Sequence, residues 1–141
     1  MKITALEEYG LRCLVQLARG GGGESLTLPA LARLEGISVP YVAKVMRALR
    51  QQGLVSSERG QAGGYRLSRR PAEVTIGEVL TRLSEKLYDV GYCQAHSGRE
   101  ERCVHAHGCS IRSVWHDVQS AVDGVLSTVT LEDLARRSTP R

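Results

Sequence analysis

Several features that would identify an enzyme or a membrane protein are missing from this sequence. Its apolar runs are far too short to span a bilayer. It has neither the G-x-G-x-x-G motif nor the G-x-x-x-x-G-K-[ST] motif of nucleotide-binding loops. It also lacks a Ser, His and Asp arrangement for nucleophilic catalysis and a pair of acids in a plausible pocket. We therefore predict that the protein is not an enzyme and has no membrane partner.

We do not expect the first apolar stretch to be a signal peptide, because Glu7, Glu8 and Arg12 interrupt it. Hydrophobic residues make up 42% of the 141-residue chain, which excludes a disordered protein. The length suits one domain with a small appendage. The net charge of +4 suits a polyanionic partner. These observations predict a folded cytoplasmic protein.

Three helix patterns follow one another in the first part of the chain. Residues 4–19 begin with a T-x-x-E capping box and carry an apolar stripe. Residues 28–35 and 39–52 each follow a hydroxyl residue that can cap a helix, and each has a proline in its first turn. Gly36 breaks the chain between them. A short helix, a glycine turn and a second helix predict a helix-turn-helix.

The third of these helices has one apolar and one basic face. Tyr41, Lys44 and Arg47 lie on or beside the face opposite the apolar one, and Ser38 precedes the helix. A surface helix often has such a polar face without any binding role. In a helix-turn-helix, however, this face reads the major groove. We therefore expect Tyr41 and Lys44 to contact base edges, with Ser38 and Arg47 on the DNA backbone.

A β-hairpin is predicted directly after the third helix. Leu54 and Val55 suit one short strand and residues 65–67 suit the other, with a glycine-rich turn between them. Arg59 and Gln61 lie in this turn, where bare backbone and long polar side chains suit phosphate or groove contacts. A hairpin in this position is a wing. The expected fold is therefore mainly α with a small β-hairpin wing, a winged helix-turn-helix domain plus a long dimerisation helix.

The whole chain is predicted to have three parts. Residues 1–85 would form the winged helix-turn-helix domain, closing with a helix that begins at a T-x-x-E capping box at Thr75. Residues 86–109 lose periodicity and predict a loop. Residues 110–141 contain a helix of about 18 residues with one continuous apolar face, followed by a short capped helix. Such a long apolar face favours pairing with a second copy over packing on its own head, so we predict a homodimer.

The four cysteines fall into two groups. Cys13 lies on the apolar stripe of the first helix and predicts a buried core thiol. Cys93, Cys103 and Cys109 lie within 17 residues of the predicted loop. Three thiols cannot all pair within one chain, and the close pairs that zinc prefers are absent. An iron–sulfur cluster, a zinc ion and a thiol redox switch all remain open, as does a loop without function.

Several of these motifs resemble those of the Rrf-type bacterial transcription regulators, which include the IscR-like and NsrR-like iron–sulfur regulators. The resemblance is carried by MKIT followed by Tyr9, by GIS-x-x-Tyr at residues 36–41, by LVSSERGQAGGYRLS at residues 54–68, by the three-cysteine loop and by IRSVW at residues 111–115. It implies a homodimeric winged-helix regulator that binds double-stranded DNA and carries an iron–sulfur cluster of either the 2Fe–2S or the 4Fe–4S type.

Two departures from the family pattern concern the ligands. The gap from Cys93 to Cys103 is longer than the family's usual first gap. Arg112 stands where IscR-like members place a histidine ligand, and Arg33 stands near where some 2Fe–2S relatives have one. NsrR-like members take a carboxylate from the partner's first helix, and Glu8 occupies that position. The resemblance therefore implies Cys93, Cys103, Cys109 and Glu8 as the metal ligands, with His107 as the alternative to Glu8.

The function predicted from these features is a DNA-binding repressor that senses redox state, nitric oxide or iron–sulfur status through the bound cluster. One alternative is a cluster-free winged-helix regulator that uses its thiols or a protein partner. A more distant alternative is a small electron-transfer protein, which would need neither the wing nor the basic helix.

Overall fold

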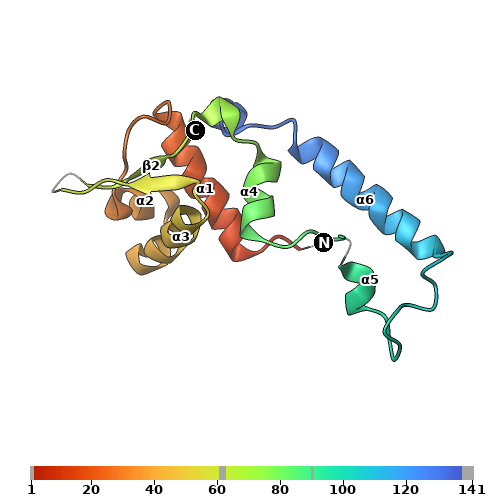
Figure 1. Ribbon diagram of the computed structural model, residues 1–141. Coiled ribbons are helices and arrows are strands. Elements are labelled where there is room, and N and C mark those ends of the chain that lie inside the picture. Colours follow the sequence, from red (N-terminus) through yellow and green to blue (C-terminus); the bar gives the residue numbers. More distant parts are fainter. Residues whose placement is uncertain (1, 61–62, 90, 138–141) are drawn as a thin grey trace.

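The computed structural model describes residues 2–60, 63–89 and 91–137. The described elements, in chain order, are α1 (Ala5–Arg19), α2 (Leu28–Glu35), α3 (Val39–Gln51), β1 (Val55–Ser57), β2 (Tyr65–Leu67), η1 (Pro71–Glu73), α4 (Ile76–Leu83), α5 (Tyr92–Ala95), α6 (Ser110–Leu126) and α7 (Leu131–Arg137). In Figure 1 the wing extends from one side of a helical head, and α6 runs along the other side. The mainly helical fold with a hairpin wing is therefore confirmed.

The first three helices form because each begins at a hydroxyl cap and turns one apolar face inward. Thr4, Thr27 and Ser38 each accept a hydrogen bond from the backbone N–H three residues later. Gly36 ends α2 with a φ of 67°, in the left-handed region that favours glycine. The fully buried side chains of the core are Cys13, Leu14, Leu17, Leu31, Val42, Val45, Met46, Leu49, Val79 and Leu131. The predicted helix-turn-helix and the predicted core face of α3 are thus confirmed.

The wing is an antiparallel hairpin in which Val55 lies opposite Leu67. A third segment extends this sheet, because Leu26 pairs with Tyr65 through N–H···O bonds of 2.9 and 2.8 Å. A Cβ added at Gly64 would lie 2.5 Å from the Leu26 carbonyl oxygen, so only glycine fits there. The chain before α2 thereby anchors the base of the wing.

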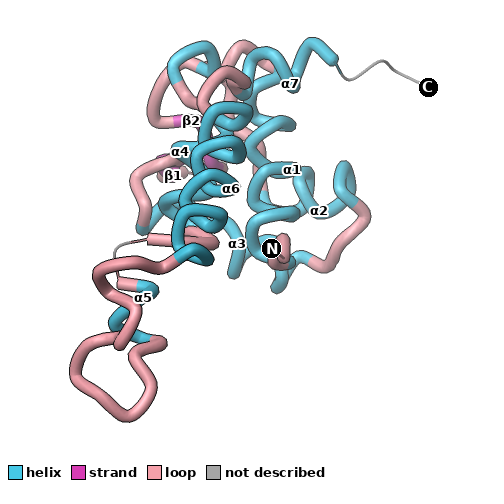
Figure 2. Tube along the Cα trace, turned by 90° about the vertical axis from the view of Figure 1, so that its right-hand side faces the viewer, coloured by secondary structure: helices cyan, strands magenta, loops and turns pink. Residues whose placement is uncertain are grey.

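The C-terminal part returns to the head through α4 and α7. An isolated antiparallel bridge joins Thr75 to Thr130, beside α4 and α7 respectively. Thr130 and Asp133 form the predicted reciprocal cap of the last helix, with bonds of 2.9 and 3.1 Å. α7 packs against α1, and its Leu131 is fully buried. Figure 2 shows α6 in front of the head and the loop that contains α5 projecting beyond it.

Three details differ from the sequence predictions. α4 ends at Leu83 instead of Glu85, and the Glu78 carboxylate contacts arginines where a reciprocal capping box was expected. The Thr75 hydroxyl still caps the helix by accepting from the Glu78 N–H at 3.1 Å. The segment expected to be irregular contains the one-turn helix α5. Within the described residues, no helix is long and apolar enough to cross a membrane.

Candidate nucleic-acid interface and cysteine loop

The exposed face of α3 carries basic side chains that are free to meet a ligand. Lys44 and Arg47 are exposed, and neither is in an ion pair with an acid in the described part of the chain. Ser38 is also exposed, although its hydroxyl is engaged in capping α3 by accepting from the Tyr41 N–H at 3.3 Å. α3 therefore presents a positive N-terminal end and, on its exposed face, two available cations.

Tyr41 has a different environment from Lys44 and Arg47. Its ring is half-buried and meets Tyr9 of α1 edge-on, with centroids 5.3 Å apart and an interplanar angle of 81°. The Arg12 guanidinium lies 5.1 Å from the centroid of the Tyr9 ring. The ring of Tyr41 thus helps to position α3 on α1.

The turn between α2 and α3 is held by polar contacts from α1. The Arg12 Nε lies 2.6 Å from a Glu35 carboxylate oxygen, and its Nη2 donates to the Glu35 carbonyl at 3.0 Å. Gln16 donates to the other carboxylate oxygen at 2.5 Å. The hydrogen bond with Glu35 raises the pKa of Arg12. These contacts fix the C-terminal end of α2, and with it the glycine turn that leads into α3.

The wing also presents a free cation, but its other arginines are paired. Arg59 is exposed and has no ion-pair partner among the described residues, whereas Gln61 lies outside them. The three arginines on and just after β2 are paired within the chain: Arg66 with Glu58, Arg69 with Glu78 and Arg70 with Glu73. Figure 1 shows α3 and the wing at the same end of the molecule, away from α6. This end therefore offers cations from two elements, which suits a phosphate backbone.

The loop cysteines are all half-buried free thiols. Cys93 lies on α5, and the Cys109 thiol caps α6 by accepting from the Arg112 N–H at 3.3 Å. Both act on Tyr88, whose pKa is raised by desolvation, by a hydrogen bond with Cys93 and by charge interactions with Cys93 and Cys109. Two of the three predicted thiol ligands thus act electrostatically on the same tyrosine. Among residues 2–60, 63–89 and 91–137, however, no three His, Cys, Asp or Glu side chains are grouped as a metal site.

The two glutamates near the start of α1 have opposite environments. Glu8 is exposed. Glu7 is only 7% exposed, accepts from the Thr4 N–H at 2.6 Å and from the Ser84 hydroxyl, and so ties α1 to the end of α4. Burial raises the pKa of Glu7, but the hydrogen bonds from Ser84 and Thr4 outweigh it and lower the pKa overall. Leu11 and Val15, the apolar flank beside Glu8, pack partly against the chain's own core.

The apolar face of α6 holds five of the ten large hydrophobic side chains that are exposed in the described part of the chain. No residue of α6 is buried. The exposed fractions are 59% for Ile111, 52% for Val114, 37% for Trp115, 38% for Val118 and 66% for Val125. Only the end of the stripe, at Leu126 and Val129, packs against the core. A single copy therefore leaves most of this helix face in water.

Comparisons with known proteins agree with this architecture. A family model described as an iron-dependent transcriptional regulator, Rrf2, matches residues 3–137. The protein rrf2 of Nitratidesulfovibrio vulgaris is 32% identical over 136 residues, which cover 96% of this chain and 88% of that protein. The HTH-type transcriptional regulator IscR of Escherichia coli is 29% identical over 134 residues, which cover 95% of this chain and 80% of that one.

Solved structures extend the agreement to the fold. CymR of B. subtilis, described as its global cysteine regulator, superimposes with a TM-score of 0.79 at 29% identity and 99% coverage of both chains. T. potens IscR gives a TM-score of 0.75 at 26% identity, covering 100% of this chain and 94% of that one. These relatives are regulators and not enzymes, in agreement with the sequence prediction. The chain belongs to the Rrf2 family and is a winged-helix, DNA-binding transcription regulator.

Proposed function

We propose that this regulator is a dimeric repressor that contacts its operator through α3 and the wing and senses redox state, nitric oxide or iron–sulfur status through its cysteine loop. The observation that carries the sensing part is the position of three free, half-buried thiols on one loop. That loop leads directly into α6, whose apolar face is exposed in a single copy. A change at the thiols therefore lies next to the surface that would join two copies.

For the operator we assign Lys44 and Tyr41 to base edges, and Ser38, Arg47, Arg59 and Gln61 to the DNA backbone or groove walls. Lys44, Arg47 and Arg59 are exposed and have no acidic partner in the described part of the chain, which supports their assignment as DNA contacts. The Tyr41 ring packs on Tyr9, and in this assignment its hydroxyl would be the group that reaches a base. A bidentate or well-placed contact to one base discriminates by roughly 1–3 kcal/mol.

Selection from a random pool of duplexes with the parent protein supplies an operator for the test. Lys44→Ala should weaken binding to the selected duplex by roughly 1–3 kcal/mol and relax the preference at one base pair. Arg59→Ala should weaken selected and scrambled duplexes alike and reduce the salt slope by about one. Arg137→Ala, a basic residue at the end of α7, is the control and should change neither. Parent-like binding by both test variants would remove α3 and the wing as the interface.

For sensing, the loop thiols have the donor chemistry that an iron–sulfur cluster requires. Cys93, Cys103 and Cys109 would hold it, with Glu8 of a second copy as the fourth ligand and His107 as the alternative. When bound, such a cluster supplies a group that oxygen and nitric oxide attack. The protein's own contribution is to draw the loop together, because in one copy the thiols are not grouped as a metal site within the described residues. Closing the loop would also fix the start of α6, where Cys109 is the cap.

A second candidate is a cluster-free sensor that responds through its thiols. The free, half-buried state of Cys93, Cys103 and Cys109 favours it, because accessible thiols can be oxidised without any bound metal. The similarity to CymR of B. subtilis, described as a global cysteine regulator, also supports it.

Iron and acid-labile sulfide counts on anaerobically purified protein, with an absorption spectrum, separate the two candidates. A cluster sensor should contain both elements, and Ala at Cys93, Cys103 or Cys109 should remove them. Cys13→Ala removes a thiol from the core and should leave the counts unchanged. A thiol sensor should contain neither element, and oxidation by diamide should change its DNA affinity reversibly. Iron and sulfide that persist in all three loop variants would exclude the proposed ligands.

A further inference from the structure

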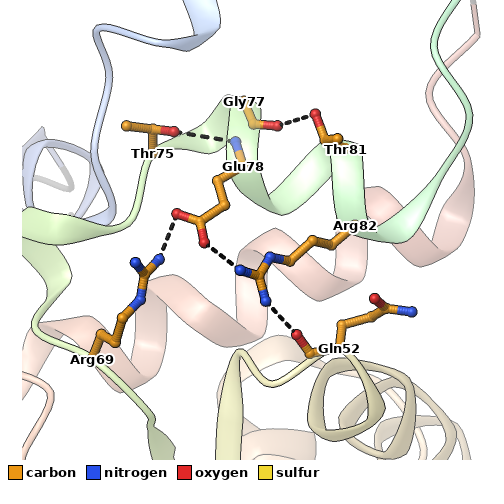
Figure 3. Close-up of polar contacts among 7 residues, drawn as sticks. All are labelled: Gln52, Arg69, Thr75, Gly77, Glu78, Thr81 and Arg82. Carbon is orange, nitrogen blue, oxygen red and sulfur yellow. Dashed lines mark hydrogen bonds and ion pairs between the residues drawn. The ribbon is translucent and has the colours of Figure 1, made fainter.

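The wing and α3, which is the proposed recognition helix, are both linked to one carboxylate, that of Glu78 on α4. Figure 3 shows this side chain between two arginines. Arg69, which follows β2 at the base of the wing, places Nη2 at 2.5 Å from Oε2. Arg82, one turn along α4, places Nη2 at 2.9 Å from Oε1. Each carboxylate oxygen therefore serves a different arginine, and the Glu78 side chain is only 24% exposed.

Arg82 connects this carboxylate to the end of α3. Its Nη1 donates to the Gln52 carbonyl at 2.6 Å, and Gln52 is the C-cap residue of α3. A cation at this end of a helix also meets the negative end of its dipole. The next residue, Gly53, has a φ of 74° and begins the turn into β1. Arg82 thus contacts the junction between the recognition helix and the first strand of the wing.

The first turn of α4 is also fixed to the C-terminal part of the molecule. A Cβ added at Gly77 would lie 3.4 Å from backbone and side-chain atoms of Leu126, so α4 and the end of α6 are in close contact. The bridge between Thr75 and Thr130 joins the start of α4 to the segment between α6 and α7. α4 therefore stands between α6 and both elements that would contact DNA.

We propose that Glu78 is a positioning residue for operator binding: through Arg69 and Arg82 it holds the wing and α3 at the relative orientation that lets both meet one duplex. The proposal rests on the proposed DNA interface and is independent of the cluster. Isolated surface ion pairs contribute little to stability. Here the pairs constrain two DNA-contacting elements at once, so their effect falls on specific binding, which needs both elements in register.

The positioning role of Glu78 can be distinguished from a simple charge effect, because the two predict opposite changes in DNA affinity when the Glu78 charge is removed. Glu78 adds negative charge near a polyanion, so its removal without any change of geometry should strengthen binding to every duplex. Under the proposal, removal of the charge frees the wing base and the α3 junction. Specific binding then weakens, while binding to a scrambled duplex stays the same or becomes slightly tighter.

The test is the Glu78→Gln variant, measured by fluorescence anisotropy on the duplex selected with the parent protein and on its scrambled version. We expect Kd for the selected duplex to rise about tenfold, because both ion pairs that hold the base of the wing and the end of α3 lose their charge. The salt slope should stay at the parent value, because no phosphate contact is removed. Glu132→Gln is the matched control, since Glu132 also pairs with an arginine four residues later, on α7. It should bind like the parent.

A parent-like or tighter Kd of Glu78→Gln for the selected duplex would overturn the proposal. If that variant does not fold, as shown by its thermal unfolding curve, Arg82→Lys decides. A lysine keeps the charge but has one ammonium group for Glu78 and the Gln52 carbonyl, so the ratio of specific to scrambled affinity should still fall, and an unchanged ratio would count against positioning. Failure of the DNA interface itself is recognised separately, because Lys44→Ala and Arg59→Ala would then also bind like the parent.

Discussion

At the scale of single residues, the neighbouring glutamates Glu7 and Glu8 have different roles: Glu7 stabilises the fold, and Glu8 is the proposed ligand. Glu7 points into the molecule, where it caps α1 and bonds Ser84. Glu8 is exposed and free to meet a second copy. A carboxylate is a weaker and more replaceable partner for iron than a thiolate, which suits the position where an oxidant attacks first. The pair therefore offers a variant and its control one residue apart.

We predict that Glu8→Ala leaves the fold intact but changes the proposed cluster. Its thermal unfolding should match that of the parent, because an exposed side chain without a structural partner is removed. The absorption spectrum should be altered and should decay faster in air, while His107→Ala should have little effect. Glu7→Ala should instead lower the free energy of unfolding by roughly 1–3 kcal/mol, because it leaves buried polar partners unpaired. An essential His107 beside a silent Glu8 would transfer the ligand role to His107.

Cys13 provides a second residue-scale prediction, one that concerns pH. Burial raises the pKa of this thiol to about 11, from an ordinary value of 9.0. The thiol is therefore favoured over the thiolate in the folded state. Its contribution to stability is fully present below pH 9.0 and is lost as the pH rises toward about 11. Chemical unfolding between these values should show the loss, and Cys13→Ala should flatten that slope.

The same burial predicts the reactivity of the four thiols. Iodoacetamide at about pH 8 should modify Cys93, Cys103 and Cys109 of the cluster-free protein long before Cys13, as read by mass spectrometry of peptides. The loop cysteines are half-buried, whereas Cys13 is fully enclosed. Equal labelling rates for Cys13 and the loop cysteines would contradict the burial of Cys13.

At the scale of elements, helix caps and apolar periodicity in the sequence predict the helices, but they do not predict contacts between segments far apart in the chain. The caps at Thr4 and Ser38 and the periodicity of α6 predict these helices within one or two residues. The contacts of Leu26 with Tyr65 and of Glu78 with Arg69 were not predicted, because each joins segments whose proximity only the folded chain creates. The spacing of Glu78 and Arg82 on one helix face was a signal for their pairing, but the T-x-x-E motif pointed to a cap instead.

The wing gives the element-scale prediction. Gly64→Ala would place a methyl group 2.5 Å from the Leu26 carbonyl oxygen, so β2 must separate from the segment before α2. We expect the free energy of unfolding to fall by roughly 1–3 kcal/mol and amide exchange to quicken in β1 and β2. Gly23→Ala is the control: Gly23 lies in the loop before α2 that also contains Leu26, its added Cβ would meet nothing within 4 Å, and its effect should be much smaller. Unchanged exchange in the strands of Gly64→Ala would show that the Leu26 pairing does not hold the wing.

At the scale of the whole molecule, the exposed apolar stripe on α6, from Ile111 to Val125, is expected to be covered by another surface. A continuous apolar helix face is unusual on a protein that remains a single copy. A second copy supplies the same face, and two-fold pairing of α6 would set the two recognition helices about 34 Å apart, one turn of DNA. The proposed role of Glu8 needs that second copy as well. Assembly, loop and operator spacing are therefore parts of one proposal.

The test of assembly uses Val118, which is 38% exposed and lies in the middle of the stripe. Val118→Asp should give a monomer by sedimentation, because pairing would bury an unpaired carboxylate. Val122 is a poorer position for this test, since it is half-buried and lines a cleft with Leu80 and Leu126 of its own chain. The monomer should keep the parent's helical content, because Val118 is not part of the core. It should bind a duplex with two half-sites no better than one with a single half-site.

The control is Ser120→Asp, which is also on α6 but off the stripe and should remain dimeric. A parent protein that sediments as a monomer at micromolar concentration would remove the dimer and, with it, Glu8 as a ligand from a second copy.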